Sequence, residues 1–221
     1  QFPNAEEIYL QAPDGVRLHS LLFKAGHPKG IVLYFHGNAG AIDSWGYAAA
    51  DFTNRGYHVL MPDYRSYGKS EGQLDYEALR SDARLFYNWV AKQYPADQIV
   101  LYGRSMGTGV ATDLAIEVPA QQLILETPYT SINDMARIRM GFLPVDLLLR
   151  YPFSNLNKLK QVKCPFHLLH GTQDELIPYQ HAVRLAEQFP GQQVLTTIPN
   201  GGHNNLSEFE IFQNRLNQLL P

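Results

Sequence analysis

Short apolar runs alternate with helix-length segments along most of the chain, and this alternation restricts the fold more than any other feature. Several runs are continuously apolar, as strands buried on both faces must be. Strands and helices in alternation imply right-handed crossovers, so we expect an α/β fold whose mostly parallel central sheet carries helices on both faces. The expected strands lie within residues 16–25, 30–37, 57–64, 98–105, 122–128, 165–171 and 193–200, and the expected helices within 43–55, 75–93, 105–117, 179–189 and 204–219.

The first two expected strands, 16–25 and 30–37, are joined by the turn-like sequence "GHPKG" and are interpreted as an antiparallel hairpin at the sheet edge. A length of 221 residues favours a single domain over residues 1–221. Within it, the segment at about 129–163 has a helical pattern without a strand. It is interpreted either as a helical connection or as a small helical cap over a pocket, because ligands bind beyond the carboxyl ends of strands in open α/β sheets. A cap would bring these apolar side chains to the substrate: Met135, Ile138, Met140, Phe142 and Leu143.

The sequence "VLYGRSMGTGVA" at residues 100–111 places Ser105 between two glycines, after an expected strand and before an expected helix. A nucleophilic serine needs a sharp strand-to-helix turn with very small neighbours, which Gly103 and Gly107 supply. The start of the following helix presents backbone N–H groups to a developing negative charge. Ser105 is therefore interpreted as a nucleophile rather than as a serine in a glycine-rich loop.

A serine hydroxyl needs a base to accept its proton, and the chain contains eight histidines. His203 lies in the glycine-rich sequence "IPNGGHNNL" after the last expected strand, from where it can reach back over the sheet. His181 opens an expected helix and is interpreted as a capping or surface residue. His36 and His170 each end an apolar run before glycine and are interpreted as structural histidines whose polar atoms are satisfied by the backbone.

Two carboxylates are candidates for the group that orients His203. Asp174 follows a buried strand and precedes a turn that leads into a helix, which leaves its carboxylate free to point across the sheet. Glu126 ends the strand that comes after the one carrying the serine, and nearby polar residues offer it backbone partners. We favour the chain order Ser105, Asp174, His203, and Glu126 stays the alternative to Asp174.

An oxyanion hole needs two N–H donors close to the nucleophile. One is expected from Met106, directly after Ser105. The other is expected from the turn "YFHGNAG" at residues 34–40, where Asn38 or Ala39 is the candidate donor.

The motifs "HGNAG", "DYRSYGKSEG", "GRSMG", "HGTQDELIP" and "GGHNNL" stand in the order and spacing of the α/β-hydrolase superfamily. Over about residues 15–220 the chain most resembles its small serine hydrolases, in the branch that includes depalmitoylating protein thioesterases and many uncharacterised microbial esterases. This resemblance implies the α/β-hydrolase fold and the triad named above. Ser66 departs from the pattern, because the branch usually has glycine there, in "DYRGYG". Members of the branch often carry an amino-terminal membrane anchor or signal.

These residues predict a serine hydrolase that cleaves ester or thioester bonds of a small-molecule or acylated substrate through an acyl-enzyme on Ser105. Two alternatives stay open: a serine peptidase of the same fold that acts on short peptides, and a non-catalytic ligand-binding protein on a hydrolase frame. Nothing in the sequence calls for a metal ion or an organic cofactor. The single cysteine, Cys164, forbids an intramolecular disulfide and is interpreted as a packed thiol at a strand end.

Charge and hydropathy restrict the partners. The chain has 18 Lys and Arg against 21 Asp and Glu, a net charge of −3, and no basic block, so we expect no nucleic-acid partner. It has no apolar run of transmembrane length. Because it begins at Gln1 rather than Met, an upstream segment is expected, and membrane contact is expected only through such a segment. The sequence leaves the oligomeric state and the cellular location open.

Overall fold

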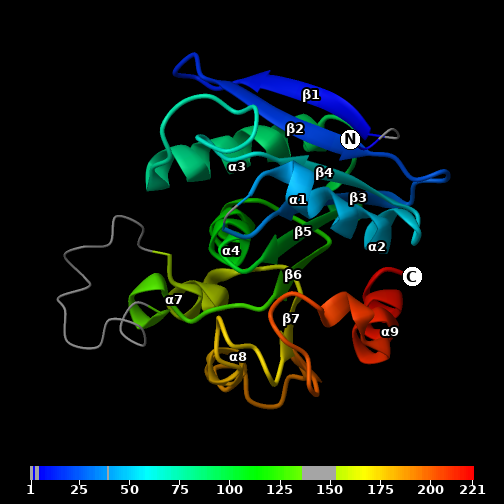
Figure 1. Cartoon of the computed structure of the whole chain (residues 1–221), viewed down its shortest axis with the longest axis vertical. Helices are drawn as coiled ribbons and strands as arrows, with labels where there is room; N and C mark the ends of the chain where they lie inside the picture. Colours follow the sequence, from blue (N-terminus) through cyan, green and yellow to red (C-terminus); the bar gives the residue numbers. More distant parts are fainter. Residues whose placement is uncertain (1, 3–4, 39, 136–152) are drawn as a thin grey trace.

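A computed structural model of the chain describes residues 2, 5–38, 40–135 and 153–221. In this part of the chain, eight strands form one sheet in the order β1-β2-β4-β3-β5-β6-β7-β8 (Figure 1). The pairs β1/β2 and β2/β4 are antiparallel, and the other neighbouring pairs are parallel. The strands are β1 (Ala5–Gln11), β2 (Arg17–Phe23), β3 (Gly30–Phe35), β4 (Tyr57–Pro62), β5 (Ile99–Arg104), β6 (Gln122–Glu126), β7 (Phe166–Gly171) and β8 (Leu195–Ile198).

The continuously apolar runs are the central strands. All residues of β3 and of β6 are buried, because helices cover both faces of the sheet. The seven expected strands are all present. The first strand, β1, was not expected from the sequence, since its residues AEEIYLQ are mostly exposed or half-buried at the sheet edge and lack a long apolar run.

The expected hairpin between the first two apolar runs is wrong. β2 forms its hairpin with β1, in a register from Ala5 opposite Phe23 to Gln11 opposite Arg17. Its other neighbour is β4, which lies between β2 and β3. Five of the seven residues of β2 are buried, so burial between two neighbouring strands outweighs the short connection to β3.

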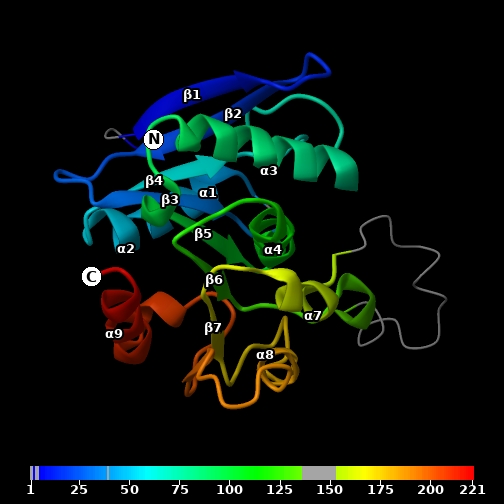
Figure 2. The ribbon, with the colours of Figure 1, turned by 180° about the vertical axis from the view of Figure 1, so that it is seen from behind.

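Helices form a layer on each face of the sheet, as expected from the alternating pattern (Figures 1 and 2). Phe86 of α3, Leu114 of α4 and Leu185 of α8 pack into the core on one face. Phe52 of α2 and Phe212 of α9 pack into the core on the other face. The described helices are α1 (Ile42–Trp45), η1 (Gly46–Ala49), α2 (Ala50–Thr53), α3 (Tyr76–Ala91), η2 (Ala96–Gln98), α4 (Gly107–Glu117), α7 (Asn155–Lys158), η3 (Leu159–Gln161), α8 (Gln180–Ala186), η4 (Leu206–Glu208) and α9 (Glu210–Leu219).

The two described ends of the segment 129–163, which stands between β6 and β7 in the chain, are hydrogen-bonded to each other. Ile132 N donates to Phe153 O at 3.0 Å, and Leu156 N donates to Thr130 O at 3.0 Å. Of the five side chains expected at the substrate, Met135 is described and half-buried. The other four, Ile138, Met140, Phe142 and Leu143, lie outside the described residues.

Among the helices of the described ranges, we find none with both the length and the apolar character needed to cross a membrane.

Candidate active site

Ser105 occupies a sharp turn between β5 and α4. Its φ of +53° lies in the left-handed region, which costs free energy for a residue with a Cβ. Two backbone hydrogen bonds hold the turn: Ser105 N donates to Glu126 O at 2.9 Å, and Thr108 N donates to Ser105 O at 3.0 Å. The strained turn presents the serine hydroxyl at the carboxyl end of the sheet, as the motif predicts.

The two glycines of the motif are required by close backbone contacts. A Cβ built on Gly103 would lie 2.4 Å from the carbonyl oxygen of Gly107. A Cβ built on Gly107 would lie 2.0 Å from the carbonyl oxygen of Phe35. Because backbone atoms cannot move aside cheaply, a side chain at either position is incompatible with this turn.

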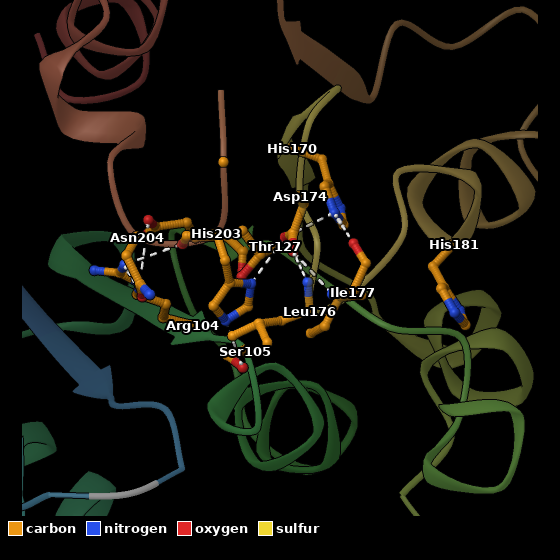
Figure 3. A network of polar contacts seen from close by, with 12 residues as sticks. Arg104, Ser105, Thr127, His170, Asp174, Leu176, Ile177, His181, His203 and Asn204 are labelled. Atoms are coloured by element: carbon orange, nitrogen blue, oxygen red, sulfur yellow. Dashed lines mark hydrogen bonds and ion pairs between the residues drawn. The ribbon is translucent and has the colours of Figure 1, made fainter. Parts of the chain in front are cut away.

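His203 lies between Ser105 and Asp174 (Figure 3). Its Nε2 is 3.2 Å from Ser105 Oγ, and its Nδ1 is 2.8 Å from Asp174 Oδ2. The three side chains come from the segments after β5, β7 and β8, which end at the same edge of the parallel sheet. The imidazole ring therefore connects a hydroxyl to a carboxylate in the arrangement of a serine hydrolase triad.

The carboxylate of Asp174 is fully enclosed by partners. Its Oδ1 accepts hydrogen bonds from the N–H groups of Leu176 at 2.9 Å and Ile177 at 2.8 Å. Its Oδ2 also lies 3.2 Å from Nε2 of His170. Burial alone would raise the pKa of Asp174, but the hydrogen bonds from His170, His203 and Ile177 hold this pKa well below its ordinary value. Asp174 is therefore a carboxylate at neutral pH.

Glu126, the alternative carboxylate, points to different partners. Its Oε1 lies 3.3 Å from Nε of Arg104, and its Oε2 accepts the hydroxyl of Tyr102 at 2.6 Å. Of the two candidate carboxylates, the structure brings Asp174 into contact with His203.

The expected oxyanion donors lie at two chain turns beside the serine. Met106 and Asn38 line the same cavity as Ser105, while Ala39 lies outside the described residues. The turn that carries Asn38 packs against the serine, since a Cβ built on Gly37 would be 3.4 Å from Ser105 Cβ. Asp63 anchors the start of α1, directly after this turn, by accepting the N–H of Ile42 at 3.0 Å.

A cavity of about 1410 Å³ opens over Ser105 and His203. One part of its lining comes from segments near 129–135 and 176–177, and another part comes from α1, α2 and α9. Met135 belongs to the first part. Apolar residues in the lining include Trp45, Tyr67, Leu74, Ile132, Met135, Leu176 and Ile177, and polar residues include Asp51, Arg104, Asn204 and Ser207.

Comparison with known proteins indicates the same class of protein as the geometry of the site. Residues 26–149 match the family described as serine aminopeptidase, S33, a family of α/β hydrolases. The chain belongs to this family. It is an α/β-hydrolase superfamily serine hydrolase.

Relatives extend the match over most of the chain. An uncharacterized protein of Mycobacterium tuberculosis is 28% identical over 207 residues, which cover 92% of this chain and 74% of the relative. The lysophosphatidylserine lipase ABHD12 of Danio rerio is 30% identical over 187 residues, which cover 74% of this chain but 47% of the relative. A solved esterase of Pyrococcus furiosus superposes with a TM-score of 0.78 at 22% identity, covering 98% of this chain and 91% of that one. The superposition on the Pyrococcus furiosus esterase shows that the two chains share a fold.

Ser66, the departure from the α/β-hydrolase branch pattern, adopts the conformation that glycine normally provides. Its φ is +66°, in the left-handed region. Its hydroxyl donates to Gly72 O at 2.9 Å, which anchors the loop locally. The loop therefore keeps the glycine-type geometry with serine in this position.

At three residues of this hydrolase the structure adds to the sequence-based interpretation or departs from it. His170, expected to be a structural histidine satisfied by the backbone, is buried with its Nε2 2.8 Å from Ile177 O, and the same nitrogen also lies 3.2 Å from Asp174 Oδ2. Arg104 was not singled out from the sequence, although its Nη2 donates to His203 O at 3.2 Å. His181, expected at the surface or as a cap, is buried, and its Nδ1 is 2.8 Å from Thr130 Oγ1. It lies apart from the triad group (Figure 3). For these residues, the sequence offered one signal: His170 ends a buried strand four residues before Asp174, a spacing that could have indicated their contact.

Proposed function

We propose that the chain hydrolyses carboxylic esters or thioesters through an acyl-enzyme on Ser105. The observation that carries this proposal is the line of contacts from Ser105 Oγ through His203 to the Asp174 carboxylate. No metal ion or cofactor is needed for this chemistry.

In the proposed mechanism, Ser105 Oγ attacks the carbonyl carbon while His203 Nε2 accepts the hydroxyl proton. The negative charge on the carbonyl oxygen is stabilised by the N–H of Met106 and by an N–H of Asn38 or Ala39. His203 returns the proton to the leaving alcohol or thiol. It then activates a water molecule that hydrolyses the acyl-enzyme, and Asp174 stays ionised throughout.

We further propose that the chain is one domain in which the segment at about 129–163 caps the acyl site. Met135 and Ile132 already line the cavity from this segment. Ile138, Met140, Phe142 and Leu143 would extend the same apolar surface. Burial of an acyl chain against such a surface favours substrates with longer acyl groups.

The names of the relatives support an ester rather than an amide substrate. One relative is a lysophosphatidylserine lipase, and one solved neighbour is an esterase. The family description names an aminopeptidase, which keeps peptide hydrolysis as the second candidate.

An aminopeptidase needs a free carboxylate to bind the substrate amine. Among the described residues that line the cavity, the carboxylates are those of Asp51 and Glu126. Glu126 is paired with Arg104, and Asp51 Oδ1 accepts Gln213 Nε2 at 3.0 Å. Glu126 is thus paired with a cation and Asp51 has one oxygen bonded to an amide, which supports an ester over an aminopeptidase substrate.

The test combines covalent labelling with turnover. A fluorophosphonate probe should label the wild-type protein, and Ser105→Ala should abolish labelling and lower kcat for p-nitrophenyl esters by about 10⁴-fold or more while the fold is retained. Aminoacyl anilides assayed in parallel should be hydrolysed far more slowly than the esters. Ester hydrolysis by Ser105→Ala within about tenfold of wild type would rule out the proposed nucleophile. An unlabelled, inactive wild type would favour the ligand-binding alternative.

A further inference from the structure

A largely buried ion pair lies next to the nucleophile turn and lines the same cavity. Arg104 is the last residue of β5 and Glu126 the last residue of β6, and the two are opposite each other in the sheet register. Their side chains are 13% and 5% exposed, and Arg104 Nε lies 3.3 Å from Glu126 Oε1. Burial alone would lower the pKa of Arg104, but the carboxylate of Glu126 raises it above its ordinary value, so the guanidinium stays charged.

Arg104 also reaches the loop that carries His203. Its Nη2 donates to the carbonyl oxygen of His203 at 3.2 Å and to Asn204 Oδ1 at 3.3 Å (Figure 3). The guanidinium carbon lies 5.1 Å from the centre of the Trp45 ring. A planar guanidinium can bind a carboxylate through one edge and a carbonyl through another at the same time, which a lysine ammonium cannot do in this fixed geometry.

These contacts close a ring that contains the reacting groups. Ser105 N donates to the carbonyl oxygen of Glu126 at 2.9 Å. The side chain of Glu126 pairs with Arg104, and Arg104 binds the carbonyl oxygen of His203. The ring ends where His203 Nε2 meets Ser105 Oγ at 3.2 Å. Both ends of the Ser105–His203 contact are therefore tied to the same ion pair, one through the backbone and one through a side chain.

We propose that the Arg104–Glu126 ion pair is a positioning device that holds His203 at hydrogen-bonding distance from Ser105. Buried ion pairs are a poor source of stability, because desolvation offsets much of their attraction, so fold stability alone does not account for this one. The inference rests on the proposed function and deepens it by naming two residues that act through His203 rather than on the substrate.

The test removes both charges together. Arg104→Met combined with Glu126→Gln leaves no unpaired buried charge, and the glutamine keeps an acceptor for Tyr102. This double variant should lower kcat and the rate of phosphonate labelling by about 100-fold, the effect of displacing a catalytic group by about 1 Å. KM should change less than kcat, within about threefold of wild type, because the pair is proposed to act on the position of His203. The single variant Arg104→Lys, which keeps the charge, should have a kcat between those of the double variant and the wild type.

The matched control is the buried pair Arg65–Asp82, with side chains 7% and 8% exposed and Nε to Oδ2 at 2.7 Å. Arg65→Met combined with Asp82→Asn should change the free energy of unfolding but leave kcat within about threefold of wild type. A folded Arg104/Glu126 double variant with kcat within about threefold of wild type, or a loss no larger than that of the control, would overturn the proposal. If the double variant does not fold, the same criteria apply to Arg104→Lys.

Failure of the proposed function would be recognised separately, as a wild type that neither hydrolyses esters nor reacts with the phosphonate. In that event, crystal structures of the wild type and the double variant decide the positioning role. The separation of His203 Nε2 from Ser105 Oγ should lengthen beyond about 3.5 Å in the variant. An unchanged separation would overturn the proposal.

Discussion

At Asp174 a single carboxylate accepts two backbone hydrogen bonds and contacts two histidines. Replacing it by asparagine should leave His203 poorly oriented and in the wrong tautomer. We expect Asp174→Asn to lower kcat by about 10³- to 10⁴-fold with little change in KM, measured with a p-nitrophenyl ester at neutral pH. Asp113, another buried carboxylate, bonds to Tyr76 and Lys158, so Asp113→Asn is the matched control and should retain kcat.

The same variant gives a second readout in stability. The pKa of Asp174 is depressed in the folded protein, so its ionised form stabilises the fold above the pKa of the unfolded chain, about 4. That contribution is lost as the pH falls through the lower pKa of the folded state. Between pH 7 and pH 2, urea denaturation should therefore show a steeper fall in the free energy of unfolding for wild type than for Asp174→Asn. Equal slopes would contradict the depressed pKa.

Residues with a local chemical requirement were predictable from the sequence, and residues that act across the fold were not. Ser105 was recognised because the flanking glycines are needed for the turn itself, within five residues of chain. Arg104 was missed because its partner His203 is 99 residues away in the sequence. The preference for Asp174 over Glu126 was made on turn chemistry. In the structure Asp174 contacts His203 and Glu126 pairs with Arg104, and the catalytic role of Asp174 stays a prediction.

At the scale of elements, the turn from β5 into α4 makes the sharpest demand on the sequence. A Cβ at Gly107 would overlap the Phe35 carbonyl on the neighbouring strand β3. We expect Gly107→Ala to lower the free energy of unfolding by at least about 3 kcal/mol and to abolish activity, measured by chemical denaturation and ester turnover.

Gly26 supplies the control for that substitution. A Cβ there meets nothing within 4 Å, so Gly26→Ala should change the free energy of unfolding by no more than about 0.5 kcal/mol. A Gly107→Ala variant as stable as Gly26→Ala would show that the turn can relax and that the close contact does not restrict the motif.

The apolar pattern predicted which elements form but not how they are ordered. Continuous runs marked the buried strands correctly, because burial on both faces leaves no room for polar residues. The insertion of β4 between β2 and β3 could not be predicted, since it depends on pairing between segments far apart in the chain. The edge strand β1 was missed because one exposed face weakens its pattern.

At the scale of the whole molecule, the cavity joins the catalytic edge of the sheet to the start of the proposed cap. Met135 lines the same cavity as Ser105 and is half-buried, so an acyl chain that reaches it removes apolar surface from water. For the wild type, each methylene that finds pocket surface should add about 0.8 kcal/mol, or about fourfold in kcat/KM, until the cavity ends.

Met135→Ala should separate this cap contribution from the chemistry. We expect kcat/KM for an octanoyl ester to fall about tenfold, while kcat/KM for an acetyl ester stays within about twofold, because the short acyl group does not reach the cap. Ile211 is the matched control, since it is 46% exposed on α9 and does not line the cavity. Ile211→Ala should leave both esters unchanged. A wild-type kcat/KM that does not change from acetyl to decanoyl esters would contradict an acyl site under the cap. Equal losses of kcat/KM on both esters in Met135→Ala would instead show that Met135 supports the structure of the active site.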